Sequence, residues 1–460
     1  MGKIKITLED LFNLPSAVIY NPDEFKPVSS VQIDSRKIKN GSLFVAIKGE
    51  KYDGHDFVKD AIRKGAGSVL INSKEYKKFS SLKIPVITVD DTIIAFGNLA
   101  NFWRKKLNAK VVSITGSNGK TTTKEMVAIL LSEKFNVVKT EANNNNHIGV
   151  PLTIFSADEK CEVLVLEQGT NHIGEIPYSA KISQPDFALI TNIGESHVEF
   201  LKNKETIYKE KSALFDAVEK NGGIILANFD DPIIKRKVGK YSSVISYGFS
   251  GNPYIKGIIK SFTKEGRTEF TVKGSKEIIK LPVYGESNAK NFLAAFVISK
   301  LLGLTWNEIK SGAKKIKPVH GRLEVQKYKE AVVIDDTYNS SPTSIKAAYE
   351  LVKKIKTFKR KIVVLGDIFE LGNKSQKIHK DLSQIFTYDK DLFVLTIGKM
   401  MINLTNELRK KNIKSIHFHF REALSLYLQY EEIENSVILV KGSRGMKMEE
   451  FVNILEKRFE

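Results

Sequence analysis

Cysteine, long apolar runs and acidic charge are scarce in this sequence. Its one cysteine, Cys161, cannot form an internal disulfide, which fits a reducing compartment such as the cytosol. The surrounding residues, CEVLVLEQG, indicate a buried strand and argue against a catalytic thiol. No run of about 18 apolar residues occurs, and the first residues, MGKIKITLEDLF, lack the apolar segment of a signal peptide. We therefore expect a soluble, cytoplasmic protein without a membrane span.

Acidic residues are outnumbered by basic ones. The 72 Lys and Arg residues against 53 Asp and Glu give a formal net charge of +19. Such an excess is typical of nucleic-acid-binding proteins. The basic residues are scattered among acidic ones, however, with no basic tail and no stripe of aromatic and basic residues. This pattern favours a solvated basic surface and no nucleic-acid partner, and a polyanionic small substrate is the other reading that the charge leaves open.

The chain has enough length for several domains. Its 460 residues, 42% of them hydrophobic, suggest about three domains. Residues 1–109 mix short strands with turns rich in Gly, Asp and Pro and end in a helical pattern. In residues 110–316 apolar runs of strand length alternate with helical periods, and residues 317–460 contain a second such series. This alternation predicts a three-domain α/β protein with parallel sheets and crossover helices in the second and third domains.

The stretch TGSNGKTTTKEM (115–126) resembles a phosphate-binding loop with a shortened spacer. The common form has four residues between its first glycine and Gly-Lys-Ser/Thr, whereas this chain has two. A predicted strand leads in and a predicted helix leads out, so free N–H groups and the helix dipole face an anion. Lys120 would then contact the β- and γ-phosphates, and the hydroxyl of Thr121 or Thr122 would hold Mg²⁺. The alternative is a glycine-rich turn with an incidental lysine.

Two polar residues follow predicted buried strands. Glu167 closes VLVLEQG, where a carboxylate is costly to bury unless it holds a metal ion or joins a hydrogen-bond network. His197 follows another apolar run, in TNIGESHVEF. Either residue alone could be a cap or a core residue. Their occurrence at equivalent strand ends beside a phosphate loop favours Mg²⁺ coordination.

Taken in order, these and further motifs resemble the Mur ligase family over essentially the whole chain. The motifs are TGSNGKTT, NNNNHIGVPLT, LEQGTNHIGEI, TNIGESHVEF, YKEKSALF, YGESNAKNFLAA, HGRLEV, DDTYNSSP, LGDIFELG and KGSRGMKME. DDTYNSSPTS and GDIFELG resemble the members that add a D-alanyl-D-alanine dipeptide. The Asp-Asn-Pro-Arg and Gly-Lys-Gly-His-Glu elements of the members that add the third amino acid are absent. Folylpolyglutamate synthases share the loop but match the other segments less well.

The resemblance implies a reaction and a domain plan. The reaction is ATP-dependent ligation of D-alanyl-D-alanine to UDP-N-acetylmuramoyl-tripeptide through an acyl phosphate, in peptidoglycan synthesis, by a monomer. The plan is a UDP-sugar-binding α/β domain (1–109), a central P-loop ATP-binding domain with a parallel sheet (110–316) and a C-terminal Rossmann-like domain (317–460). Two alternatives remain: the ligase that adds the third amino acid, and a basic, nucleotide-dependent nucleic-acid-binding protein.

The resemblance also implies the residues of the site. Catalytic residues are Lys120, Glu167, His197 and Lys211, and Thr121, Glu167, His197 and Lys211 are expected to hold Mg²⁺, as two ions. ATP-binding residues are Gly116, Ser117, Asn118, Gly119, Lys120, Thr121, Thr122, Asn288, Asn291, Arg322, Asp336 and Tyr338. Substrate-binding residues are Ser35, Arg36, Asn145, Asn146, Asn339, Lys441, Ser443 and Arg444.

Four positions carry open questions. Lys211 lies in a charged helical segment, where a surface lysine is the alternative, and the resemblance implies that it reacts with CO₂ to become a carbamate. For Arg36 the alternative is a salt-bridged turn. The family often has His where Ser287 stands and Asn where Ser341 stands. The first departure leaves Asn288 and Asn291 as the expected nucleotide contacts, and the second puts one dipeptide or nucleotide contact in doubt.

Overall fold

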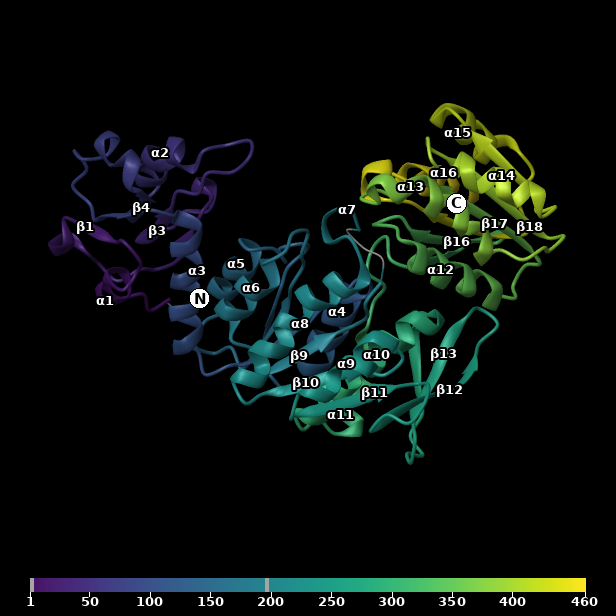
Figure 1. The fold of residues 1–460 in the computed structure, drawn as a ribbon, viewed down its shortest axis with the longest axis horizontal. Helices are drawn as coiled ribbons and strands as arrows, with labels where there is room; N and C mark the ends of the chain where they lie inside the picture. Colours follow the sequence, from purple (N-terminus) through teal and green to yellow (C-terminus); the bar gives the residue numbers. More distant parts are fainter. Residues whose placement is uncertain (1–3, 195–197) are drawn as a thin grey trace.

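The computed structural model describes residues 4–194 and 198–460, which fold around three β-sheets. The sheets follow one another along the longest axis of the molecule, from the N-terminal lobe (purple) to the C-terminal lobe (green to yellow) in Figure 1. Each sheet has helices packed against it, which confirms the predicted α/β class with three domains. Within these ranges no helix has the length and apolar character that crossing a membrane requires.

The N-terminal sheet is mostly parallel. Its strands lie in the order β1 (Val18–Tyr20), β5 (Val86–Val89), β4 (Ala66–Asn72), β3 (Ser42–Val45) and β2 (Val31–Gln32), and β1 runs antiparallel to β5. The α-helices of this domain are α1 (Leu8–Phe12), α2 (Val58–Arg63) and α3 (Thr92–Lys106). Strands β3, β4 and β5 are short apolar runs with nearly every side chain buried. Such strands are typical of a sheet that is covered on both faces.

Helix α3 joins the N-terminal and central domains through a shared core. It begins where Asp91 Oδ1 accepts hydrogen bonds from the backbone of Ile93 and Ile94. Trp103 is fully buried and donates from Nε1 to the Ala157 carbonyl at 3.0 Å. Apolar residues of the N-terminal sheet and of the central domain belong to the same buried cluster. The first domain therefore packs against the second through a continuous apolar core. The boundary between residues 109 and 110 stays a prediction.

The central sheet is parallel in its larger part and antiparallel at one end. Its strands lie in the order β14 (Ile279–Tyr284), β13 (Arg267–Val272), β12 (Ile255–Phe262), β11 (Val244–Gly248), β10 (Ile224–Asn228), β9 (Phe187–Ile190), β6 (Lys110–Thr115), β8 (Val163–Glu167) and β7 (Val137–Lys139). Strands β12, β13 and β14 pair antiparallel, which alternation of strands and helices did not predict. A tight turn explains the difference, because Gly266 adopts a φ of +85° between β12 and β13.

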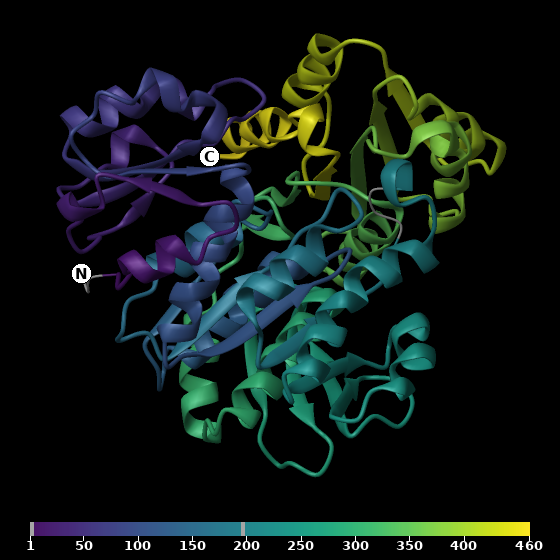
Figure 2. The same ribbon diagram turned by 60° about the vertical axis from the view of Figure 1, so that its left-hand side comes forward.

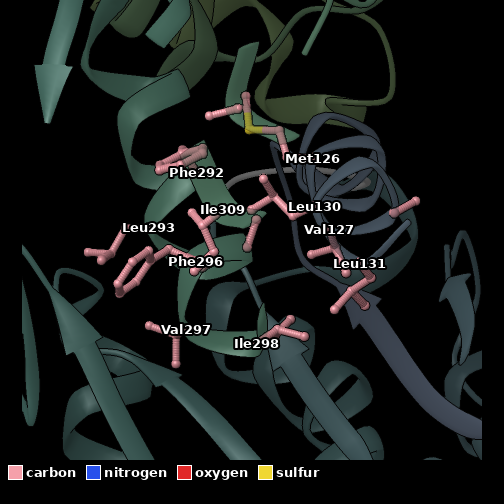
Figure 3. Packing of buried hydrophobic residues seen from close by; sticks show 14 of the residues in the cluster. Met126, Val127, Leu130, Leu131, Phe292, Leu293, Phe296, Val297, Ile298 and Ile309 are labelled. Atoms are coloured by element: carbon pink, nitrogen blue, oxygen red, sulfur yellow. The ribbon is translucent and has the colours of Figure 1, made fainter. Parts of the chain in front are cut away.

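Helices cover both faces of the central sheet. They are α4 (Lys120–Leu131), α5 (Gly149–Ser156), α6 (Glu175–Ser183), α7 (Val198–Leu201), α8 (Lys204–Lys220), α9 (Pro232–Lys237), α10 (Gly285–Leu301) and α11 (Trp306–Lys315). Figure 3 shows Met126, Val127 and Leu130 of α4 directed at the apolar side chains of α10 and α11. Because α4 follows the phosphate loop, this core fixes the direction in which the loop faces.

The C-terminal sheet is doubly wound. Its strands lie in the order β15 (Glu324–Lys327), β16 (Ala331–Asp336), β20 (Ser436–Lys441), β17 (Arg360–Gly366), β18 (Leu392–Ile397) and β19 (Ser415–Phe418), and only β15 is antiparallel. Its helices, α12 (Pro342–Lys354), α13 (Ser375–Asp381), α14 (Ile402–Lys410), α15 (Arg421–Tyr430) and α16 (Glu449–Phe459), lie on both sides of the sheet (Figure 2). This arrangement confirms the Rossmann-like prediction, and the boundary at residues 316 and 317 stays a prediction.

Candidate active site

A cavity of about 770 Å³ lies where the phosphate loop faces the C-terminal domain. Most of the predicted site residues line it. They are Ser117, Asn118, Gly119, Lys120, Thr122, Asn145, Asn146, Glu167, Asn288, Asn291, Arg322, Asp336, Tyr338, Asn339, Lys441, Ser443 and Arg444. Gly116, Thr121, Lys211, Ser35 and Arg36 are not among the lining residues, and His197 lies outside the described residues.

The phosphate loop is held by the end of strand β9. Ser117 N donates to Asn192 O and Asn118 N to Asn192 Oδ1, both at 3.0 Å, and Thr191 Oγ1 donates to Asn118 O at 2.6 Å. Gly116 adopts a φ of +145°, and a Cβ added there would lie 1.9 Å from Thr191 Oγ1. The shortened loop therefore needs glycine at its first position and uses the neighbouring strand as its support.

The start of α4 offers donors to an anion. Its N-cap, Gly119, supplies no side-chain cap, so no side chain in the described ranges caps the first backbone N–H groups, which can face a ligand. Lys120 Nζ donates to the Gly116 carbonyl at 2.9 Å. Burial lowers the pKa of Lys120; Glu167 opposes this shift and Arg322 adds to it. An incoming polyphosphate would stabilise the charged form of this lysine.

Glu167 presents a free carboxylate oxygen at the end of β8. The side chain is buried, and its Oε1 accepts a hydrogen bond from Asn145 Nδ2 at 2.8 Å. Its Oε2 is buried and has no hydrogen-bond partner among the residues that the structure describes. A buried oxygen without a donor is costly, and oxygen is the ligand that Mg²⁺ prefers. The residue therefore fits a metal ion, and Asn145 sets its orientation.

Lys211 is buried, so the surface-lysine alternative is wrong. Its side chain is 1% exposed on helix α8. Burial lowers its pKa well below the usual value, and the charge of Lys120 adds to this shift, while Glu210 opposes it. Glu210 accepts hydrogen bonds from the backbone of Gly174 and Ile176, both at 2.8 Å. These bonds fix α8 against the start of α6.

A buried ion pair lies at the C-terminal wall of the cavity. Asp336 and Lys441 end neighbouring parallel strands, β16 and β20, and their Oδ2 and Nζ atoms lie 2.6 Å apart. Lys441 Nζ also donates to the Asn339 carbonyl at 2.8 Å, and Leu323 N donates to Asp336 Oδ1 at 3.1 Å. Burial raises the pKa of Asp336, and Lys441 opposes this rise. The pair fixes the loop between Asp336 and Asn339.

Arginine and tyrosine side chains stack beside this pair. The guanidinium carbon of Arg322 lies 4.1 Å from the ring centroid of Tyr338, and that of Arg444 lies 5.9 Å from it. Arg322 Nε is buried and has no hydrogen-bond partner in the described part of the chain. A guanidinium with a free donor suits a phosphate or carboxylate oxygen.

The phosphate loop contacts the C-terminal domain directly. Asn118 Nδ2 donates to Thr343 Oγ1 at 2.9 Å, and Ser341 Oγ donates to Asn118 Oδ1 at 3.1 Å. Ser341 also caps helix α12, where its Oγ accepts a bond from Ser344 N at 3.2 Å. The serine at this position thus has an interdomain role. The other departure, Ser287, lines the cavity.

Two predicted asparagines approach the loop from α10. Asn288 is buried and donates from Nδ2 to the Tyr284 carbonyl at 2.9 Å. Asn291 lies against Gly119, since a Cβ added to that glycine would be 2.5 Å from Asn291 Oδ1. Helix α10 therefore brings both side chains to the cavity.

Ser35 and Arg36 lie in the N-terminal domain, apart from the cavity lining. Arg36 donates to Asp34 through Nε at 2.9 Å and through Nη2 at 2.8 Å, which lowers the pKa of Asp34 to about 2. The salt-bridged turn is thus the conformation that the structure contains. Ser35 is buried.

Several lining residues were missed by sequence reasoning. They are Thr170, Asn171, Glu175, Asn192, Thr343 and Phe369. Thr170, Asn171, Asn192 and Phe369 lie two to four residues after the ends of buried strands, and this position was the available signal. Thr343 has no such signal, because it is recognisable only once helix α12 is placed against the loop.

The fold and the cavity together define a class. A phosphate loop at the end of a parallel sheet, facing a Rossmann-like domain across a polar cavity, is the arrangement of a nucleotide-dependent, multidomain enzyme. Three family models match the chain: "Mur ligase family, catalytic domain" at residues 27–104, "Mur ligase middle domain" at 114–299 and "Mur ligase, glutamate ligase domain" at 321–444. The chain belongs to the Mur ligase family.

Full-length relatives point to one branch of this family. The chain is 34% identical to the UDP-N-acetylmuramoyl-tripeptide–D-alanyl-D-alanine ligase of Bacillus subtilis, with 98% of each chain covered, and 33% identical to that of Escherichia coli, with 99% of each covered. Among solved structures, it is similar to a MurF of Acinetobacter baumannii, with a TM-score of 0.85, 28% identity and 98% of each chain covered. It is also similar to a MurF ligase of Thermotoga maritima in complex with ADP, with a TM-score of 0.81, 28% identity, and 94% of this chain and 97% of that one covered.

Proposed function

We propose that this protein joins D-alanyl-D-alanine to UDP-N-acetylmuramoyl-tripeptide at the expense of ATP, giving the UDP-muramoyl-pentapeptide of peptidoglycan synthesis. The relatives named for this activity match it over their full length. The observation that carries the proposal is a cavity with Lys120 on one wall and Arg322, Lys441 and Arg444 on the other. Such a cavity suits a reaction between two anions, a carboxylate and a triphosphate.

The reaction has two steps. The peptide carboxylate attacks the γ-phosphorus of ATP, the bond to ADP breaks, and an acyl phosphate forms. The amine of D-alanyl-D-alanine then attacks the acyl carbon, phosphate leaves, and the nitrogen loses a proton as the amide forms. Lys120 and the free N–H groups of α4 lower the repulsion between the anions in the first step. Gly116, Ser117 and Asn118 keep the loop in place for the phosphates.

Magnesium would be held by Thr121 and Glu167, with His197 as the third expected ligand. The free Oε2 of Glu167 supports this assignment, and Asn145 keeps that carboxylate in place. When bound, the two Mg²⁺ ions would neutralise phosphate charge. Thr122 is buried at the cavity wall and supports the loop.

Lys211 is proposed to become a carbamate. Its neutral amine attacks CO₂, and a proton is released as the N–C bond forms. Burial and the nearby charge of Lys120 lower the pKa of Lys211 and so favour the reactive neutral form. The product is an anion, which would replace repulsion between two lysines by attraction and add a negative group to the metal site.

Helix α10 of the central domain and the C-terminal domain would together supply the contacts to two ligands. Asn288, Asn291, Arg322, Asp336 and Tyr338 are proposed nucleotide contacts, and Asn339, Lys441, Ser443 and Arg444 are proposed dipeptide contacts. The exposed guanidinium of Arg444 suits the dipeptide carboxylate, because its paired N–H donors match two oxygens.

The UDP-linked substrate would extend from the N-terminal domain into the cavity. Ser35 and Arg36 are proposed to contact the UDP end, and Asn145 and Asn146 the peptide end. Arg36 would exchange the carboxylate of Asp34 for the diphosphate, since both accept paired N–H donors. The domain limits 1–109, 110–316 and 317–460, a monomeric state and a cytoplasmic location, where ATP and UDP-linked sugars are available, belong to this proposal.

Phosphate release by the purified chain tests the proposal. ATP should be hydrolysed only when UDP-N-acetylmuramoyl-tripeptide and D-alanyl-D-alanine are both present. Turnover with UDP-muramoyl-dipeptide and a free amino acid would instead identify the enzyme of the preceding step. Binding of DNA or RNA with a steep salt dependence, without ligation, would support the nucleic-acid alternative.

A further inference from the structure

A group of metal-ligating side chains lies outside the cavity, where the chain enters the C-terminal domain. His320 Nδ1 is 3.1 Å from Glu324 Oε2 and 4.0 Å from Asp335 Oδ2, and the three donor atoms lie within 4.8 Å of one another. None of the three residues lines the nucleotide cavity. We propose that His320, Glu324 and Asp335 bind a divalent transition-metal ion of the Zn²⁺ type, at a site separate from the magnesium site and independent of the ligase reaction.

The sheet itself places the two carboxylates together. Strands β15 and β16 pair antiparallel, with Glu324 directly opposite Asp335. Side chains at opposite positions of such a pair lie on the same face, and two like charges there repel each other. Because side chains alternate along a strand, Asp335 points away from the face on which its neighbour Asp336 meets the cavity. A cation between Glu324 and Asp335 would convert this repulsion into attraction.

Asp335 has one oxygen engaged and one free. It is fully buried, and its Oδ1 accepts hydrogen bonds from Thr337 N at 3.0 Å and from Thr337 Oγ1 at 2.6 Å. Its Oδ2 is buried and has no hydrogen-bond partner among the described residues. The two bonds from Thr337 fix the carboxylate so that the free oxygen is directed at His320 and Glu324. A buried, fixed and unpaired oxygen is an arrangement that a metal ion satisfies.

The donor set indicates the class of metal. Mg²⁺ and Ca²⁺ are held mainly by oxygen ligands, whereas an imidazole between two carboxylates suits Zn²⁺ and its first-row neighbours better. Ligands bound tetrahedrally at the usual zinc distances lie about 3.3–3.6 Å apart. The separations of 3.1 and 4.0 Å bracket this value, so small side-chain movements complete the geometry. The exposed ring of His320 leaves room for water as a further ligand.

The ion would stabilise the entry to the C-terminal domain. Gly321 N donates to Glu324 Oε2 at 3.3 Å, and Leu323 N donates to Asp336 Oδ1 at 3.1 Å. The segment 320–324 is therefore tied to β16 through Leu323 and held together by the bond between Gly321 and Glu324. A metal ion on His320, Glu324 and Asp335 would add a third connection beside Arg322.

Metal content of the full chain tests the site. The nucleotide-free protein is dialysed against a buffer that contains Zn²⁺ and an excess of Mg²⁺. Bound zinc is then measured by mass spectrometry. His320→Gln should bind one equivalent less than the unaltered protein, and it should fold because this side chain is exposed. His419→Gln is the matched control, since His419 is an exposed histidine outside the proposed site whose ring contacts the ring of His417. This control should keep the full zinc content.

Cobalt and thermal unfolding give independent readings. Co²⁺ should produce visible absorption bands that His320→Gln lacks, and Zn²⁺ should raise the melting temperature of the unaltered protein and of His419→Gln but not of His320→Gln. The proposal is overturned if the unaltered protein binds no zinc, or if His320→Gln keeps the same zinc content and the same Zn²⁺-dependent stabilisation.

Discussion

Replacing Glu167 by Gln should stabilise the nucleotide-free protein and inactivate the enzyme. Glu167 is buried with Oε2 unpaired, and no described cation contacts it directly. The substitution keeps the shape and leaves an amide oxygen to accept the bond from Asn145, but it removes the charge. The same charge is what a Mg²⁺ ion would use. One change should therefore raise stability without metal and weaken the response to metal.

The size of both effects follows from the burial. A buried unpaired polar group costs about 1–3 kcal/mol, and a charged one costs more. Exchanging the carboxylate for a neutral amide, whose N–H₂ group stays unpaired, is therefore expected to gain about 1 kcal/mol. For a cooperative unit of about 200 residues this corresponds to a rise in Tm of about 2–4 °C. Loss of one group that stabilises transferred charge lowers kcat by about 10²–10³-fold.

Glu210 provides the matched control. It is also buried, but its oxygens accept bonds from Gly174 N, Ile176 N and Thr170 Oγ1. Glu210→Gln places an N–H₂ group against a backbone donor and should cost about 1–3 kcal/mol. The two substitutions should thus shift the Tm in opposite directions.

Thermal unfolding in EDTA and in Mg²⁺ with ADP measures both variants. Glu167→Gln should unfold at a higher temperature in EDTA and gain less from Mg²⁺ with ADP than the unaltered protein does. Glu210→Gln should unfold at a lower temperature in both buffers and keep its response to Mg²⁺. A lower Tm for Glu167→Gln in EDTA, or an undiminished Mg²⁺ response, would refute the assignment of Glu167.

Three further substitutions test other parts of the account. Lys211→Ala should lower turnover by about 10²–10³-fold, and acetate should restore part of it; full activity in the variant contradicts the carbamate. Lys441→Met should lower the free energy of unfolding in urea by about 3–5 kcal/mol, because the charge of Asp336 is left buried without its ion-pair partner. Adding Asp336→Asn should recover part of this loss. Strictly additive losses of stability in the double variant would contradict the pairing. Burial lowers the pKa of Lys361 from its ordinary 10.5 to about 8. Between these two pH values the unfolded chain binds one proton more than the folded chain, so the free energy of unfolding should rise with pH. Lys361→Met should lack this rise, and identical pH profiles of the two proteins would contradict the shift.

The parallel strands were predictable because burial on both faces leaves a plain signal. The run AVVIDD coincides with β16, and VLVLE coincides with β8. The antiparallel ribbon of β12 to β14 carries the half-buried Lys256 and the exposed Lys260, so its pattern resembles a surface segment. Its pairing depends on turns and on contacts with α10, which local pattern does not encode.

Lys211 shows what periodicity could have added. The buried residues Ile207, Leu214, Phe215 and Val218 of α8 follow helical spacing, and Lys211 falls on the same stripe. The neighbouring charges in YKEKS concealed this position. The contact of Asn118 with Thr343 had no comparable signal, because it joins residues 225 positions apart in the sequence.

The fate of one oxygen atom tests the central claim most directly. The acceptor carboxylate of UDP-N-acetylmuramoyl-tripeptide is labelled with ¹⁸O at both oxygens, and the phosphate released during ligation with D-alanyl-D-alanine is examined by mass spectrometry. An acyl phosphate transfers one carboxylate oxygen to phosphate when the amine attacks, so each phosphate should contain a single ¹⁸O and the new amide should keep the other. Unlabelled phosphate would contradict phosphorylation of the peptide and, with it, the proposed reaction.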